Sequence, residues 1–283
     1  MSGGRSPNGA SRRGGWLQPM VALLVTAVFI GAPLWLVLVT SFKPQGEAQR
    51  PNLDLPKVWQ PIQNYLQVLS EGRILQGLLN SLLVVLPSTI LILVLGAMAA
   101  WIFARRSGKA ASGAYYFVIA GMLLPPAVVT LVLELRWLGL ANSQLGLIAT
   151  YTSMYLPLAV FLMTGFIRLL PIELEEAARI DGANPTRIFF WIILPLLRPV
   201  IATATIMVVL FSWSDVFYAS FVLGGGERAT LPLNLLQVAS AQLYQNNWHL
   251  VFAYIVLMSL PMVVLFLVAQ RQIIAGVTSG AVK

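Results

Sequence analysis

The chain has no cysteine, one histidine and few charged residues among its 283 positions. Without cysteine, a disulfide framework, a thiol nucleophile and a thiolate-bound metal are all excluded. The single histidine, His249, excludes a metal site built from several imidazoles, and we predict no metal site. Charged residues make up 10% of the chain, against about 25% in an ordinary soluble domain.

Apolar residues are correspondingly abundant. Hydrophobic residues make up 58% of the chain, and the mean hydropathy is +0.80. A soluble domain of this size cannot hide so much apolar surface from water. The composition therefore excludes a soluble enzyme domain, a disordered chain and a nucleic-acid-binding module, and it predicts a polytopic helical membrane protein.

Several apolar runs are long enough to cross a membrane, which requires about 20 residues in a helix. The first run could be a signal peptide, but it is too long for one and no cleavage motif follows it, so we expect a retained helix. We predict a disordered cytoplasmic N-terminal tail over 1–18, a six-helix domain over 19–274 and a cytoplasmic tail over 275–283. The all-α fold would have transmembrane helices near 19–41, 78–104, 114–136, 146–167, 198–222 and 250–270.

The basic residues predict the direction of these helices. With the N-terminus inside, the inner segments carry 12 of the 18 lysines and arginines and the outer segments carry 6. Because lysine and arginine accumulate in cytoplasmic loops, this bias predicts that both termini are cytoplasmic. Most of the net charge of +8 then follows from topology and does not indicate a nucleic-acid partner.

The inner segment 168–197 has the pattern of two short helices separated at Gly182. Glutamates occupy the early turns of the first helix, where carboxylates suit the positive end of the helix dipole. Gly182 is the residue type that stops a helix in the left-handed conformation. Asn184 followed by Pro185 predicts the start of the second helix.

This segment resembles the EAA loop of ATP-binding-cassette (ABC) importer permeases. Its motif is Glu176-Ala177-Ala178, three residues, Gly182, nine residues, and then Ile192-x-Leu194-Pro195. Ile180-Asp181-Gly182-Ala183 is similar to the carbohydrate branch, and the last nine residues resemble the tail of the second, maltose-type sugar permease. Other matches include Asn80-Ser81 and Trp213-Ser214-Asp215-Val216-Phe217, in which Ser214 replaces the family's usual Asn.

The resemblance implies a type I importer permease whose loop 168–197 forms a cytoplasmic coupling helix that docks on an ATPase. No G-x-x-x-x-G-K-[ST] phosphate loop occurs in the chain. The resemblance therefore implies no catalytic residue and no directly bound cofactor, with ATP and Mg on a separate ATPase subunit. The coupling residues implied are Glu176, Ala177, Ala178, Asp181, Gly182, Ile192, Leu194 and Pro195.

The resemblance also implies partners and a location. The expected partners are a second permease, forming a heterodimer, an ATPase homodimer, an extracytoplasmic sugar-binding protein and membrane lipid, with no nucleic acid. The location would be the cytoplasmic membrane of a bacterium or archaeon. The sugar, direct contact of this chain with substrate, and a homodimer in place of the heterodimer all stay open.

Asp215 is the one acidic residue within a predicted span. Such a residue usually faces a cavity or a partner, so Asp215 has two interpretations. It is either an interfacial carboxylate that holds helices together or a residue of the outer gate or sugar path. Further candidates for the translocation path are Asn80, Ser81, Tyr151, Tyr155, Trp213 and Phe217.

Sugar import has three alternatives. A permease for glycerol phosphate or another small polar solute fits the same motifs. A secondary transporter would predict inverted repeats and charges near the membrane midplane, and neither is evident. An intramembrane serine protease would need a serine with a partner histidine inside the membrane; His249 is predicted at the edge of a span.

Overall fold

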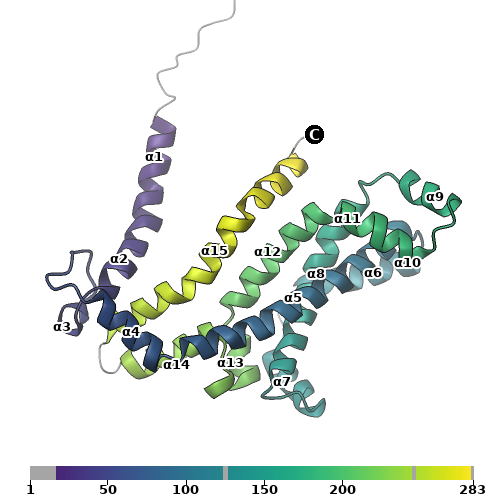
Figure 1. Cartoon of the computed structure of the whole chain (residues 1–283). Coiled ribbons are helices and arrows are strands. Elements are labelled where there is room, and N and C mark those ends of the chain that lie inside the picture. The colour runs from purple at the N-terminus through teal and green to yellow at the C-terminus, as the bar shows by residue number, and fades with distance from the viewer. Residues whose placement is uncertain (1–16, 124–126, 244–246, 282–283) are drawn as a thin grey trace, which may run out of the picture. The chain divides into compact units, whose positions relative to one another are not determined.

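The computed structural model describes residues 17–123, 127–243 and 247–281 (Figure 1). All regular elements in these residues are helical, and none is a strand. The prediction of an all-α membrane protein is confirmed. The predicted N-terminal tail falls mainly on residues 1–16, which lie outside the described residues, as do residues 282 and 283.

Four unbroken stretches are long and apolar enough to cross a membrane, at Gln18–Ser41, Ile74–Arg105, Gln144–Ile167 and Trp248–Val268. Two bent helix pairs raise the possible number to six. One pair is Lys109–Leu123 with Val128–Trp137, and the other is Pro185–Leu196 with Arg198–Ser214, bent by 74°. The spans therefore agree in number with the prediction when each bent pair counts as one.

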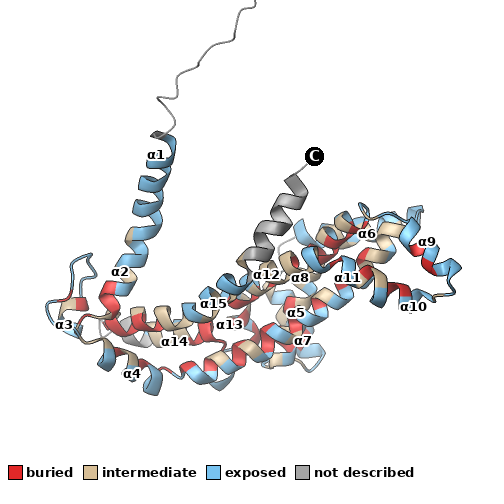
Figure 2. Ribbon diagram, turned by 45° about the horizontal axis from the view of Figure 1, so that its top comes forward, coloured by how far each residue is buried: buried red, intermediate tan, exposed pale blue. Residues whose placement is uncertain are grey.

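The chain divides into two compact units, and the first contains residues 1–68 and 242–256. Its membrane-length stretch consists of α1 (Leu17–Thr26), the π-helical turn η2 (Ala27–Gly31) and α2 (Ala32–Ser41), followed by α3 (Gln45–Ala48). Asn64 of α4 (Pro61–Glu71) donates to the carbonyls of Ser41 and Lys43, each at 2.9 Å. These bonds attach α4 to the end of α2, whereas α1 is exposed (Figure 2).

The second unit contains residues 69–241 and 257–283. Its centre is the pair α5 (Ile74–Arg105) and α8 (Gln144–Ile167). A Cβ placed on Gly96 of α5 would lie 3.0 Å from the Cβ of Ala159 on α8. These small residues therefore let the two backbones approach closely, as is common between membrane helices.

The remaining helices of this unit follow in chain order. They are α6 (Lys109–Leu123), α7 (Val128–Trp137), α9 (Glu173–Ile180), α10 (Pro185–Ile188), the π-helical turn η3 (Phe189–Ile193), α11 (Leu194–Leu196), α12 (Arg198–Ser214), α13 (Phe217–Leu223), the 3₁₀ turn η4 (Gly226–Arg228) and α14 (Leu231–Leu243). Helix α15 (Trp248–Ala281) begins in the first unit and continues in the second.

The predicted single helix over 198–222 is wrong. Helix α12 ends at Ser214, and a separate helix α13 begins at Phe217. Asp215 is extended, with φ −72° and ψ 126°. Its side chain accepts hydrogen bonds from backbone N–H groups of the helix that follows. A short acidic side chain that competes for backbone N–H groups favours a helix start over a helix interior.

Candidate functional site

The loop between α8 and α12 has the two-helix form that the sequence predicts. Gly182 adopts φ +81°, a conformation that glycine reaches without a Cβ penalty. Its N–H donates to the carbonyl of Arg179 at 3.0 Å, and the N–H of Ala183 donates to the carbonyl of Ala178 at 2.9 Å. This pair of bonds is the Schellman arrangement that ends a helix, so Gly182 stops α9.

Asn184 starts the second helix. Its side-chain oxygen accepts from the N–H of Arg187 at 2.8 Å, and Pro185 occupies the first helical position. Because a cap satisfies an N–H group that has no partner within the helix, it fixes where the helix begins. One residue, Ala183, separates the stop at Gly182 from the cap, so the turn between α9 and α10 is short.

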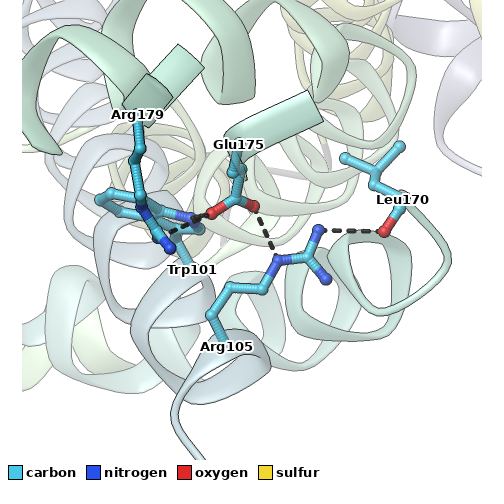
Figure 3. A network of polar contacts seen from close by, with 5 residues as sticks. All are labelled: Trp101, Arg105, Leu170, Glu175 and Arg179. Carbon is cyan, nitrogen blue, oxygen red and sulfur yellow. Dashed lines mark hydrogen bonds and ion pairs between the residues drawn. The ribbon is translucent and has the colours of Figure 1, made fainter. Parts of the chain in front are cut away.

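A buried carboxylate attaches α9 to α5 (Figure 3). Glu175 is fully buried, and its Oε1 accepts from Nε of Arg105 at 2.7 Å. Its Oε2 accepts from the indole N–H of Trp101 at 3.1 Å and lies 3.6 Å from a guanidinium nitrogen of Arg179. The same Arg105 donates to the carbonyl of Leu170 at 3.0 Å. This network, the Glu175 clasp, fixes both the start of the loop and α9 on the end of one long helix.

Apolar packing on the buried face of α9 adds to the attachment made by the Glu175 clasp. Ala178 lies three residues after Glu175 on the same face of α9 and packs into a core with Ile188, Phe189 and Ile193. The rings of Phe189 and Trp101 lie 5.7 Å apart. One face of α9 therefore packs against the membrane helices.

The opposite face of α9 is open. Glu176, Ala177, Asp181 and Gly182 are exposed, and Ile180 is 87% exposed. Residues 176, 177 and 180 are spaced to lie on one helical face. The face therefore carries a large apolar side chain, a small residue and a carboxylate together, a combination suited to a protein partner.

The structure divides the eight predicted coupling residues. Four of them, Glu176, Ala177, Asp181 and Gly182, are exposed at the tip of the loop, and Ala178 is buried beneath them. Ile192 and Leu194 are half-buried, and Pro195 is exposed further along the loop. Glu175 and Arg105 are not among the residues predicted from the sequence. The available signal was the three-residue spacing of Glu175 and Ala178 on one face of an amphipathic helix.

Sequence comparison identifies the family. Residues 92–278, about two thirds of the chain, match the family described as binding-protein-dependent transport system inner membrane component. The chain belongs to this family. It is therefore a multi-pass inner-membrane protein and a transporter permease subunit, a class that is not itself catalytic.

Two relatives of this permease align over most of its length. It is 36% identical over 267 residues to the melibiose/raffinose/stachyose import permease MelC of Bacillus subtilis, covering 93% of this chain and 95% of that protein. It is 34% identical over 263 residues to the diacetylchitobiose uptake permease NgcG of Streptomyces coelicolor, covering 92% and 87%. A chain of a bacterial alginate ABC transporter has the same fold, with a TM-score of 0.77 at 21% identity and coverage of 94% and 99%.

Asn80 and Ser81 of α5 make hydrogen bonds to the segment around η4. The Asn80 amide donates to the carbonyls of Glu227 and Ala229 at 2.7 and 3.0 Å, and its oxygen accepts from Gln144 at 2.9 Å. Ser81 accepts from the backbone N–H of Leu231 at 2.8 Å. Both side chains are buried, and these contacts attach the segment around η4 to α5.

Tyr151 and Asp215 form a second cluster in the permease. The hydroxyl of the fully buried Tyr151 donates to Oδ2 of Asp215 at 2.9 Å. The same carboxylate accepts from the N–H groups of Tyr218 at 3.2 Å and Ala219 at 2.9 Å. Asp215 therefore connects α8 to the first turn of α13. Tyr155 continues the cluster, with its ring 6.0 Å from that of Tyr151.

The side chains of the other two path candidates make no hydrogen bond to this cluster. Trp213 is 6% exposed and lines an apolar cavity of about 450 Å³ between α12 and α15. Phe217 is 55% exposed and packs edge-on against Tyr218 and Phe221. Within the described residues, no three His, Asp or Glu side chains are grouped so that they could hold a metal ion.

Proposed function

We propose that this permease is the transmembrane subunit of an ABC importer that moves a sugar or oligosaccharide across the cytoplasmic membrane. Supporting the substrate class, relatives that align over most of the chain are named for melibiose, raffinose and stachyose, and for diacetylchitobiose. A third relative, 33% identical over 226 residues, is named for trehalose. Glycerol phosphate or another small polar solute is the alternative substrate; a secondary transporter is the less favoured alternative mechanism.

The observation that carries the proposed mechanism is that α9 is firmly attached to α5 on one face and exposed on the other. The Glu175 clasp fixes α9 to α5, while Glu176, Ala177 and Ile180 face outward on the same helix. A displacement of α9 by a bound partner would move α5 as well, because the ion pair that joins the two helices is buried and its hydrogen bonds are charge-assisted. The proposed partner at this face is an ATPase homodimer that carries the ATP and Mg.

The proposed assembly has further parts. It contains a second permease, forming a heterodimer, and an extracytoplasmic sugar-binding protein. One solved relative in fold, at TM-score 0.69, is an alginate ABC transporter in complex with an alginate-bound periplasmic protein. Both termini of the permease would be cytoplasmic, and α9 would then lie on the same side of the membrane as the proposed ATPase.

Placing a long cation on the exposed face of α9 tests the docking. In the assembled transporter in proteoliposomes, Ala177→Arg should lower transport-coupled ATP hydrolysis by about tenfold or more, because a central contact of an interface cannot admit a bulky charged group. The matched control is Ser107→Arg, which adds the same charge at an exposed position in the α5–α6 connection. Unchanged hydrolysis in Ala177→Arg would contradict docking at this face.

A second variant separates docking from mechanical coupling. No atom lies within 4 Å of a Cβ built on Gly182, so Gly182→Val acts through backbone strain at φ +81°, which costs about 1–2 kcal/mol for an L-residue. We expect this variant to insert normally and to hydrolyse ATP without uptake. Normal uptake by Gly182→Val would show that coupling does not depend on the left-handed turn at Gly182.

The substrate class is tested on the binding protein encoded alongside the permease. Thermal-shift screening with raffinose, trehalose, diacetylchitobiose and glycerol phosphate should give stabilisation by an oligosaccharide, by about 2.7 kcal/mol at one hundred times its dissociation constant. Stabilisation by glycerol phosphate alone would replace the sugar proposal with the alternative.

A further inference from the structure

A groove lies beside the coupling loop in the second unit, with a volume of about 450 Å³. One wall is a face of α5 whose residues follow helical i, i+3, i+4 spacing. The other wall runs from the turn η3 through α11 into α12, across the 74° bend. The lining residues are Ile90, Leu93 and Val94 on the first wall and Phe190, Leu194, Pro195, Arg198 and Ile201 on the second.

Arg198 is the one charged residue in this lining. It is exposed, and its guanidinium makes no hydrogen bond or ion pair to any side chain that the structure describes. A charged residue in a membrane helix usually pairs with a group of opposite polarity or faces water. The groove is therefore an apolar surface on which a hydrocarbon chain could lie, and the Arg198 guanidinium stands in its wall as a cation.

The aromatic residue next to the groove indicates the depth of this cation. Trp191 directly follows the groove residue Phe190 and is 78% exposed. Exposed tryptophan is enriched where the membrane meets water, at the level of the lipid headgroups. Arg198 follows seven residues later in the chain, and a long arginine side chain can extend its guanidinium to a phosphate at the membrane surface.

We propose that this groove binds one anionic phospholipid, with an acyl chain between α5 and α11–α12 and the phosphate at Arg198. Basic pockets between membrane helices recognise anionic headgroups by the same combination of charge and shape. The site is independent of the transported solute. It shares Leu194 and Pro195 with the loop that follows α9, so the bound lipid would brace the connection between the loop and α12.

The absence of cysteine from the chain allows a direct test. The full chain carrying Ile90→Cys, labelled with bimane, is placed in nanodiscs of phosphatidylethanolamine containing equal mole fractions of brominated phosphatidylglycerol or brominated phosphatidylcholine. Bromine quenches bimane only at close range, so the two lipids report occupancy of the groove. We expect phosphatidylglycerol to be preferred by about fivefold at this position, the size of one cation acting on an anionic lipid.

Charge and position controls complete the experiment. Arg198→Gln should abolish the preference and Arg198→Lys should retain most of it, whereas Arg106→Gln, which removes an exposed cation outside the groove, should leave it unchanged. Bimane at Val264, an exposed residue of α15, should show no preference. Equal quenching by both lipids at Ile90 would overturn the proposal as ordinary lipid contact, and quenching by neither would overturn it because the groove would then hold no lipid.

Discussion

Glu175→Ala is expected to lower the free energy of unfolding by about 3–5 kcal/mol, because it leaves the Arg105 guanidinium buried without its carboxylate. The side chain of Arg105 is 15% exposed and that of Glu175 is 0% exposed. The indole N–H of Trp101 also loses its acceptor. Unfolding titrations of the purified permease in mixed micelles measure the loss, and coupled ATP hydrolysis should fall with it.

Glu176→Ala is the matched control, since it removes the same group from the neighbouring, exposed position. This variant should change the unfolding free energy by less than about 0.5 kcal/mol. The double variant Glu175→Ala/Arg105→Ala should be less destabilised than the sum of its two single variants, because the two residues share one interaction. Additive losses would show that the clasp does not act as a unit.

Asp215→Ala should destabilise the permease by about 2–4 kcal/mol, because the carboxylate accepts three hydrogen bonds and one donor is the buried Tyr151 hydroxyl. Two of the bonds start α13, through the N–H groups of Tyr218 and Ala219. Asp215→Asn keeps an acceptor oxygen and should lose less. The same unfolding titration compares the unmodified permease with Asp215→Ala and Asp215→Asn.

Tyr151→Phe isolates the bond between the helices, since it leaves the cap of α13 in place. We expect it to cost about 1–2 kcal/mol, which is less than Asp215→Ala. If Asp215→Ala were fully stable but raised the KM for transport, the carboxylate would belong to the solute path and not to helix packing. The two interpretations of Asp215 that the sequence leaves open thus predict different measurements.

The start and stop of the loop helices could be predicted because each depends on local chemistry. A glycine that adopts φ +81° ends α9, and an asparagine followed by proline begins α10. Neither effect requires knowledge of the distant chain. The break at Asp215 also has a local cause, but a run of apolar residues concealed it, because hydropathy averages over a window and carries no information on backbone hydrogen bonds.

The buried carboxylate of the loop could not be assigned from the sequence. Glu175 and Glu176 are adjacent and chemically identical, and the resemblance to importer permeases favoured Glu176. Which of them is buried depends on where α5 presents Arg105 and Trp101, 70 and 74 residues away in the chain. The roles of Asn80 and Ser81 were hidden for the same reason, since their partners lie about 150 residues away.

The sequence by itself determined the class of protein: an apolar, cysteine-free chain with membrane-length helices and a motif that resembles the EAA loop. Hydropathy, helix signals and motif spacing are properties of neighbouring residues, so they can be read without the fold. Only the tertiary structure decided which side chains hold that motif in place, that Ala178 is buried while Ala177 is exposed, and that Arg198 lines an otherwise apolar groove. Burial and pairing follow from helix packing, which brings together residues that no local pattern connects.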